Sequence, residues 1–214
     1  AEVPEQEEIR RVLRAATIAR SIAPDIPISI DTFRSSVVKA VVGEIGEIVV
    51  NDISAGELDD QMIQTVAELR LPYIAMHMRG TPQNMQHHSE YDNVCDSVIA
   101  YLKHKAEELQ AVGIQQIILD LGFGFAKTID QNYELLKSLE VFKSVRVAEG
   151  RSPRILVGVS RKSLIYKYLN ISPDESLPAT QVLNFAALQN GADILRVHDV
   201  AEAARTVALY RQLA

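Results

Sequence analysis

The sequence has little cysteine, no long apolar run and no excess of positive charge. Cys95 is the only cysteine, which excludes a disulfide within one chain and a Cys-X-X-Cys metal site. No apolar stretch approaches the roughly 20 residues that a membrane-spanning helix needs. The acidic start AEVPEQEEIRR lacks the basic and apolar parts of a signal peptide. We therefore expect a cytoplasmic protein with no membrane partner.

The charge balance argues against a second class of partner. The 214 residues carry 22 Lys and Arg against 28 Asp and Glu, which gives a formal net charge of -6. A general nucleic-acid-binding protein has a basic contact surface, so we expect no nucleic-acid partner. A local basic pocket for an anion remains compatible with this composition. With 47% hydrophobic residues the chain can bury a large core, and we expect a single domain over residues 1–214.

Short β-rich runs alternate along the chain with segments of helical period. Most of the runs are continuously apolar, as in strands covered on both faces, and they end near Asp31, Asp52, His77, Leu121, Ser160 and Asp199. The segments with helical period are 7–21, 35–42, 59–70, 93–112, 132–144, 178–189 and 201–213. The period also changes after Ser163, where a further helix is predicted to begin. This alternation predicts parallel βα units with right-handed crossovers.

Polar groups follow all six apolar runs, whereas the starts of the runs show no comparable set. In a (β/α)8 barrel the carboxyl ends of the strands meet on the face that carries the active site. An open doubly wound sheet binds ligands mainly at one switch point. Polar groups at every end therefore favour an α/β fold of the TIM (β/α)8 barrel type. Because only six strands are recognisable, we expect the first two βα units to be missing or incomplete in this chain.

The polar groups at the strand ends suit two parts of one ligand. Three side chains that can read the donor and acceptor edge of a flat heterocycle are Asp31, Asn51 and Asp120. Positive or donor groups suited to a phosphate-like anion follow the last two strands, at Arg161, Lys162, Arg196 and His198. A charge in a barrel mouth is costly without a partner or a ligand. The pattern indicates a heteroaromatic substrate that carries a phosphate-like group.

The segment DLGFGFAK follows the fourth apolar run. It contains only part of the GxGxxG dinucleotide fingerprint, and no acidic ribose partner is identifiable. We interpret Gly122 and Gly124 as allowing a tight turn that lets a ligand approach the backbone. Phe123 and Phe125 are open to either of two roles, packing in the core or lining a pocket.

The histidines leave alternatives open. His77 ends an apolar run, so it either takes part in catalysis or orients the loop that follows it. His87 and His88 lie in the polar segment 78–93 without a matching ligand spacing nearby, and we interpret them as solvated loop residues.

Six stretches in this order and spacing resemble the dihydropteroate synthase family: SIDTFR, NDISAG, MHMRGTPQNMQ, DLGFGFAK, LVGVSRKSLI and ADILRVHDV. The resemblance runs from near Glu7 to the carboxyl terminus. It implies a TIM barrel, usually a homodimer, that acts in folate biosynthesis. The implied reaction joins 6-hydroxymethyl-7,8-dihydropterin diphosphate to p-aminobenzoate and releases diphosphate and 7,8-dihydropteroate.

The resemblance also implies roles for individual residues. The pterin ring would lie against the polar groups and apolar walls of Asp31, Asn51, Ile53, Met76, Asp120, Gly124, Phe125 and Lys162. The catalytic pair would be Asp120 and Lys162. The p-aminobenzoate would meet Ser160, Arg161 and Lys162, and the diphosphate would meet Arg196 and His198. Alternation along the chain turns Arg161 away from its two neighbours, which leaves it open to a role as a rim anchor.

Two departures from the family pattern bear on activity. Leu121 stands where the family usually has proline. The family's first strand, with its metal-binding asparagine, and two mobile amino-terminal loops have no counterpart here. The resemblance implies Mg2+ as cofactor but no metal ligand in this chain, and we expect the chain alone not to turn over. The alternatives are a pterin-dependent methyltransferase barrel, which needs no such anion site, and a non-catalytic pterin-binding paralogue.

Overall fold

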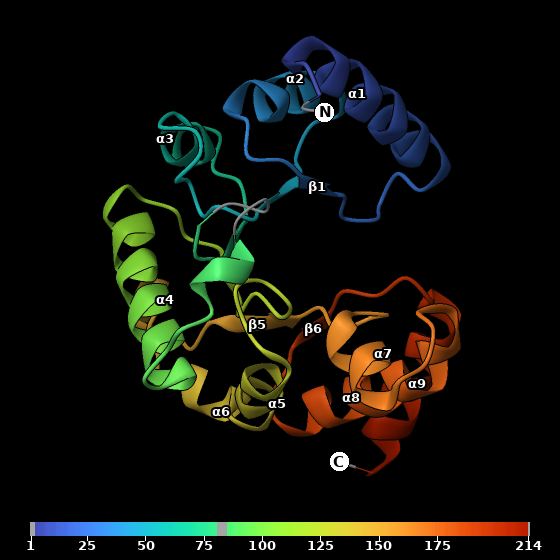
Figure 1. Ribbon diagram of the computed structural model, residues 1–214. Helices are drawn as coiled ribbons and strands as arrows, with labels where there is room; N and C mark the ends of the chain where they lie inside the picture. The colour runs from blue at the N-terminus through green and yellow to red at the C-terminus, as the bar shows by residue number, and fades with distance from the viewer. Residues whose placement is uncertain (1–2, 81–84, 214) are drawn as a thin grey trace.

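Six parallel strands form one curled sheet in the computed structural model, which describes residues 3–80 and 85–213 (Figure 1). The strands are β1 (Ser29–Asp31), β2 (Val49–Asp52), β3 (Tyr73–Met76), β4 (Ile117–Asp120), β5 (Arg154–Val157) and β6 (Ile194–Leu195). Each pairs in parallel with the next along the chain. In the described part of the chain β6 does not pair with β1, so the sheet stays open between its two edges. The predicted parallel βα order is confirmed.

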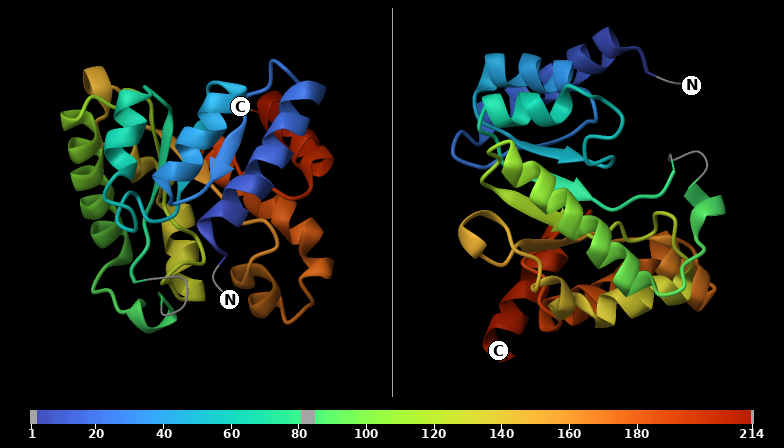
Figure 2. Two further views of the ribbon diagram at one scale, coloured as in Figure 1. Left: turned by 90° about the horizontal axis from the view of Figure 1, so that it is seen from above. Right: turned by 90° about the vertical axis from the view of Figure 1, so that its left-hand side faces the viewer.

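Helices lie around the outside of the sheet (Figure 2). They are α1 (Glu5–Ile22), α2 (Ser35–Ile45), α3 (Met62–Glu68), α4 (Val94–Ala111), α5 (Ile129–Lys137), α6 (Leu139–Phe142), α7 (Ser163–Leu169), α8 (Leu177–Gln189) and α9 (Val200–Leu213). Short 3-10 turns occupy η1 (Met85–His88), η2 (Ala148–Gly150) and η3 (Asp174–Ser176). None of these described helices combines the length and apolarity needed to cross a bilayer.

One predicted helix, over 132–144, is wrong in its bounds and continuity. The structure divides this region into α5 and α6, because Ser138 between them leaves the helical conformation. The chain then turns so that Leu139 and Phe142 are both fully buried. The start of α5 lies earlier than predicted because Thr128 and Gln131 form a capping box, in which each side chain pairs with the other residue's backbone.

The hydrophobic core lies between the sheet and the helices. Strand residues that point outward, such as Val50, Tyr73 and Leu119, are fully buried in it. Burying each large apolar side chain contributes roughly 1.5–3 kcal/mol. Successive strand residues face opposite sides of a sheet, so Met76 and Asp120 face the inner side. The inner side is therefore where the strands present groups to a ligand.

The last two strands are shorter than predicted. The sequence indicated a fifth strand up to Ser160 and a sixth up to Asp199, but β5 ends at Val157 and β6 holds only two residues. The amide of Arg196 still donates to the carbonyl of Val157 at 2.9 Å. Beyond that bond the two segments leave the ladder, which frees their polar side chains to turn toward the carboxyl face of the sheet.

Candidate functional site

Asp120 lies at the centre of the carboxyl face. It is the last residue of β4 and is fully buried, and its Oδ1 accepts a hydrogen bond from the Gly122 amide at 2.9 Å. Its Oδ2 lies 2.8 Å from Nη1 of Arg196, which forms an ion pair across β5. A Cβ on Gly158 would lie only 2.9 Å from Nη2 of Arg196. Glycine at this position therefore leaves the space that the guanidinium occupies.

This ion pair leaves hydrogen-bonding capacity unused. The two facing atoms, Oδ2 of Asp120 and Nη1 of Arg196, are buried, and their orientation gives neither a hydrogen-bond partner. Buried polar atoms are nearly always hydrogen-bonded in folded proteins. The pair is thus held together by charge alone and remains able to bond a ligand.

Asn51 and Asp31 extend the polar group toward the open edge of the sheet. They are register partners at the ends of β2 and β1, so their side chains share a face. Asn51 is buried, and its Oδ1 has no hydrogen-bond partner among the described residues. Burial of the carboxyl raises the pKa of Asp31, while the Arg196 charge and a contact with Asn51 oppose that rise. An amide and a carboxyl side by side present both donor and acceptor atoms.

Lys162 reaches the same region from the turn before α7. Its Nζ donates to the carbonyl oxygen of Phe123 and lies 4.9 Å from the centre of the Phe125 ring. Desolvation lowers the pKa of Lys162 to about 8, although the Asp120 charge acts against the shift. The structure thus brings a cation, a carboxylate and an aromatic ring together.

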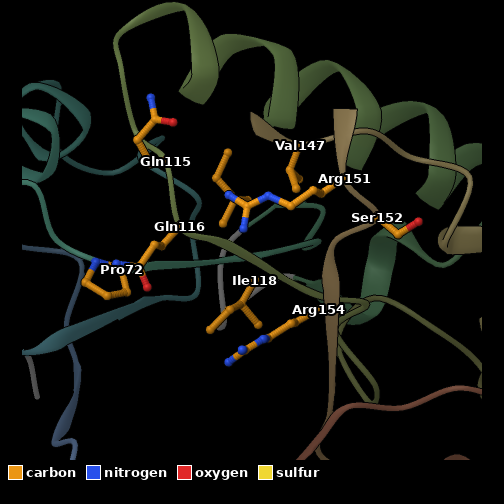
Figure 3. Close-up of a pocket in the computed structure, with 9 residues that line it drawn as sticks. Pro72, Gln115, Gln116, Ile118, Val147, Arg151, Ser152 and Arg154 are labelled. Carbon is orange, nitrogen blue, oxygen red and sulfur yellow. The ribbon is translucent and has the colours of Figure 1, made fainter. Parts of the chain in front are cut away.

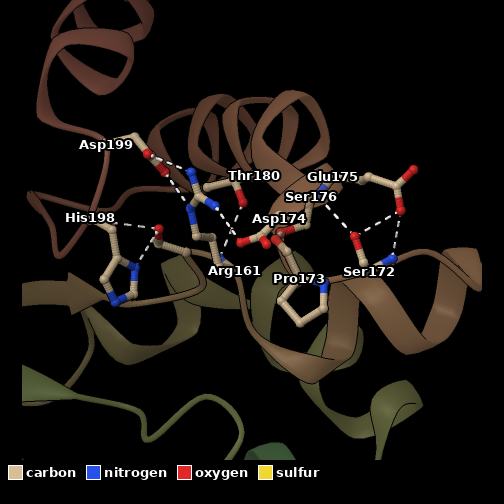
Figure 4. Close-up of polar contacts among 10 residues, drawn as sticks. Arg161, Ser172, Pro173, Asp174, Glu175, Ser176, Thr180, His198 and Asp199 are labelled. Carbon is tan, nitrogen blue, oxygen red and sulfur yellow. Dashed lines mark hydrogen bonds and ion pairs between the residues drawn. The ribbon is translucent and has the colours of Figure 1, made fainter.

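Figure 4 shows Arg161 turned toward Asp199, with His198 on the other side of the same segment. Oγ of Ser160 lies 3.0 Å from Nδ1 of His198 and joins the segment after β5 to the segment after β6. Arg161 turns away to the rim, where Nε and Nη2 donate to the two carboxylate oxygens of Asp199 at 2.9 and 2.7 Å. The structure therefore engages Arg161 as an anchor between two loops, whereas Ser160 and His198 remain beside the polar group.

The match to known proteins extends over most of the chain. Residues 1–198 match the family described as pterin binding enzyme.

The chain belongs to the pterin-binding enzyme family.

Named relatives of this pterin-binding chain are dihydropteroate synthases. That of Haemophilus influenzae is 36% identical over 202 residues, which is 94% of this chain and 70% of the relative. That of Escherichia coli is 35% identical over 206 residues, or 94% of this chain and 69% of the relative. The folic acid synthesis protein of Pneumocystis carinii is 38% identical, but the matched region spans only 27% of its length.

Solved structures give the same result for the fold. The dihydropteroate synthase of Yersinia pestis, in a sulfonamide drug complex, superposes with a TM-score of 0.92 at 32% identity over all of this chain and 75% of that one. The Burkholderia cenocepacia enzyme, complexed with 7,8-dihydropteroate, gives 0.89 at 32% identity over all of this chain and 76% of that one. The predicted TIM-barrel class is confirmed, and the six strands form part of such a barrel.

Apolar side chains border the polar side chains of the candidate site, which are Asp31, Asn51, Asp120 and Arg196. Met76 is the register partner of Asp120, is almost fully buried and shares its inner face. Ile53, Gly124 and Phe125 are only partly buried. Phe123, by contrast, is fully buried in the core, which resolves the two roles left open for these phenylalanines. Phe125 is the one with exposed ring surface beside Lys162.

His77 lies on the helix side of the sheet, away from the inner polar set. It is 1% exposed, and its ring meets Tyr101 of α4 edge-on at 5.0 Å between centroids. Burial, then the charges of Lys127 and Arg79, lower the pKa of His77 to about 3. His87 lies outside the described side chains, and His88 is exposed.

Lys127 ends the DLGFGFAK segment and had no predicted role. It is 5% exposed, and its Nζ lies 3.0 Å from Nδ1 of His77. Asn132 was missed as well: its Oδ1 accepts from the Gly124 amide at 2.7 Å. The usable signal was a lysine directly after an otherwise apolar turn, since lysine is rarely buried without a reason.

Two hollows of the pterin-binding chain lie at the opposite, amino ends of the strands. One of about 150 Å³ is lined by residues such as Gln116, Val147 and Arg151 (Figure 3). A second of about 720 Å³ opens beside it and is rich in isoleucine, for example Ile28 and Ile48. The candidate site is at the carboxyl face, where the buried polar atoms of Asn51, Asp120 and Arg196 lie.

Proposed function

We propose that this protein acts as a dihydropteroate synthase of folate biosynthesis. It would condense 6-hydroxymethyl-7,8-dihydropterin diphosphate with p-aminobenzoate to give 7,8-dihydropteroate and diphosphate. The observation that carries the proposal is a group of buried polar atoms at the strand ends: Asn51 Oδ1, which has no hydrogen-bond partner, beside the ion-paired Asp120 Oδ2 and Arg196 Nη1. Such atoms are costly unless a ligand satisfies them. The named relatives and the product complex of the Burkholderia enzyme support the same reaction.

The pterin ring would bind on the inner face of the sheet. Its amino-pyrimidine edge would donate to Asp120 and exchange hydrogen bonds with Asn51 and Asp31. Lys162 would stand beside the ring with Phe125, and the apolar walls would come from Ile53, Met76 and Gly124. The open hydrogen-bonding atoms of Asn51 and Asp120 support this assignment.

The diphosphate and the p-aminobenzoate would lie farther along the strand ends. Arg196 and His198 would hold the diphosphate by charge and hydrogen bonds. The p-aminobenzoate would meet Ser160 and Lys162. Arg161 would serve this part of the site indirectly, because its guanidinium is already bonded to Asp199.

The proposed reaction breaks one bond ahead of forming another. The bond between the pterin methylene carbon and the diphosphate oxygen breaks first, and both electrons leave with the diphosphate. The resulting cation is delocalised into the dihydropterin ring, where the Asp120 carboxylate stabilises it. Arg196 and His198 neutralise the departing anion. The p-aminobenzoate nitrogen then bonds to the methylene carbon and gives up one proton to water.

The magnesium ion that the resemblance implies finds no ligand set here. No group of three His, Cys, Asp or Glu that could hold a metal gathers among residues 3–80 and 85–213. The groups at the diphosphate end, Arg196 and His198, supply positive charge or hydrogen-bond donors, whereas Mg2+ needs oxygen ligands. No step of the proposed reaction is assigned to a metal.

We also propose a homodimer that works in the cytoplasm. Support for a partner copy comes from exposed apolar side chains on α8 and α9, at Val182, Val200, Leu209 and Leu213. Light scattering on the purified full-length protein tests the dimer. A monomer at micromolar concentration would overturn it.

Binding and product formation together test the proposed function. Full-length protein is titrated by calorimetry with the pterin diphosphate and then with p-aminobenzoate, and dihydropteroate is sought by chromatography. We expect both substrates to bind and the product to form. Binding without product would favour a non-catalytic pterin-binding protein. Binding of a pterin with no affinity for diphosphate would favour a methyltransferase barrel, and no pterin binding would overturn all three.

A further inference from the structure

Lys127 lies behind the turn that follows β4. Its ammonium has three hydrogen-bond partners: Nδ1 of His77 and the carbonyl oxygens of Gly122 and Phe125, all at 3.0 Å. All three partners are uncharged: two are backbone carbonyl oxygens, and burial keeps His77 neutral. An ammonium has three N–H groups, so this arrangement uses every donor that Lys127 possesses.

A buried ammonium without a bonded carboxylate is costly. Desolvation lowers the pKa of Lys127 to about 7, and only the Asp120 charge acts against that shift. The other charges facing it, Lys162 and Arg79, lower its pKa further, and His77 is neutral. The fold therefore retains a cation that its surroundings disfavour, which calls for a compensating role.

The two lysines hold the same turn from opposite sides. Lys127 binds the carbonyls of Gly122 and Phe125 from the helix side, and Lys162 binds the intervening carbonyl of Phe123 from the inner side. The turn is tightly packed. Gly122 has a φ of 68°, and a Cβ on it would lie 1.9 Å from the carbonyl oxygen of His77. The hydrogen bonds from Lys127 to the carbonyls of Gly122 and Phe125 therefore also help to fix the residues between them.

We propose that Lys127 is a positioning residue for the pterin ring, which rests on the function proposed above. By fixing the turn from Gly122 to Phe125, it sets the Phe125 ring and the Phe123 carbonyl to which Lys162 is anchored. It touches neither substrate. Loss of its hydrogen bonds would let the Phe125 wall and the Lys162 anchor move together, while the diphosphate end, built on Arg196 and His198, stays in place.

The test measures two ligands on one variant. Lys127→Met in the full-length protein removes the ammonium at similar length. Lys105→Met is the matched control, because Lys105 is also a buried lysine but is paired with Glu108 on its own helix, at 2.8 Å. Dissociation constants are measured for 6-hydroxymethylpterin and for inorganic diphosphate at pH 6.

We expect Lys127→Met to raise the dissociation constant of the pterin about tenfold or more, as for loss of a charged hydrogen bond. That of diphosphate should change less than about threefold. Lys105→Met should change neither. Equal losses for both ligands would mean that Lys127 serves the whole fold, and unchanged pterin binding would mean that it does not position the ring. Either result overturns the proposal, whereas a wild-type protein that binds no pterin overturns the proposed function instead.

A pH series adds a readout that general destabilisation would not change. Between pH 5.5 and 7.5 the wild-type affinity for the pterin should fall as Lys127 loses its proton and one of its three donors. The Lys127→Met variant should lack this fall, while contributions from Asp31 and Lys162 remain in both. An identical profile for the two proteins contradicts the proposal. If the Met variant does not fold, Lys127→Gln, which keeps an N–H donor, is measured with the same criteria.

Discussion

The two ends of the same six strands differ in what they bury. The carboxyl ends bury ionisable and polar groups, among them Asn51, His77, Asp120 and Lys127. At the amino ends the hollows are lined by isoleucines such as Ile28 and Ile48, and the charged Arg154 is exposed. The strands keep the same parallel register from their amino ends to their carboxyl ends. The difference therefore lies in which residues are placed at each end and not in the backbone.

The two ends also differ in how much stability the fold gives up to bury polar groups. Burying a polar group without a partner is unfavourable by about 1–3 kcal/mol. The carboxyl face accepts that cost at Asn51 Oδ1, beside the buried Asp120–Arg196 ion pair. At the amino-end hollow Nε of Arg20 also lacks a partner, but the other nitrogens of that guanidinium donate to backbone carbonyls. In barrels of this class the two faces separate activity from stability. Substitutions at the two ends should therefore have opposite effects on activity and on folding.

The largest loss of activity is expected from Asp120→Asn. This substitution removes the charge that would stabilise the pterin cation, and kcat/KM should fall on the order of 10²–10³-fold. The control is Asp25→Asn, the same change at an exposed residue of the amino-end hollow. Steady-state kinetics and thermal melts are compared on both. Near-normal turnover by Asp120→Asn would remove this residue from the chemistry.

The reverse pattern is expected from Ile48→Ala at the amino end. Ile48 is 1% exposed and lies in the core cluster just before β2. Its truncation should lower the free energy of unfolding by about 3 kcal/mol, because a cavity remains. Pterin affinity of the folded variant should be unchanged. Urea unfolding and calorimetry at low temperature measure the two quantities, and a matching loss of pterin affinity would break the comparison.

Arg196→Ala should weaken one ligand selectively. Loss of a charged hydrogen-bond donor is worth about 1.5–3 kcal/mol, or roughly 10–100-fold in the dissociation constant of diphosphate. The pterin dissociation constant should rise less, because Asn51 and Lys162 remain. Calorimetric titration with diphosphate measures the effect. If the variant binds diphosphate as the wild type does, the anion site lies elsewhere on the carboxyl face.

His77 predicts a pH effect on stability. Its pKa is about 3 in the folded protein and near 6.5 when unfolded, so between these values the unfolded chain binds a proton that the folded one excludes. Stability should fall as pH drops through this window, by up to about 1.4 kcal/mol per pH unit. His77→Gln should reduce the slope. Equal slopes in urea melts from pH 6.5 to pH 4.5 would contradict the neutral buried histidine.

The smallest effect is expected at the rim. Arg161→Ala and Asp199→Asn both break the two-bond contact between the loops, so they should raise the KM for p-aminobenzoate equally and by at most about fivefold. The double variant should be no worse than either single one. A much larger effect of Arg161→Ala than of Asp199→Asn would show that Arg161 contacts the substrate directly.

The sequence predicted the strand order, the polar strand ends and the TIM-barrel class well, because these follow from local pattern. Continuous apolar runs and the 3.6-residue period are visible in short windows, and parallel strands bring their carboxyl ends together without further information. The predicted bounds of individual strands and helices were less accurate. The strand predicted to reach Ser160 stops at Val157, since a ladder continues only where a neighbouring strand supplies partners.

Local pattern alone identifies the groups that can meet at the carboxyl face. They all follow apolar runs: Asp31, Asn51, Asp120, Lys162, Arg196 and His198. Which of these groups are in contact depends on the packing of the folded chain. It paired Asp120 with Arg196 across Gly158, turned Arg161 to Asp199 and placed Lys127 behind the turn. Distances between segments far apart in the chain depend on how helices and strands pack, and no local pattern contains them. Burial, and with it the lowered pKa values of His77 and Lys127, arises from the same packing.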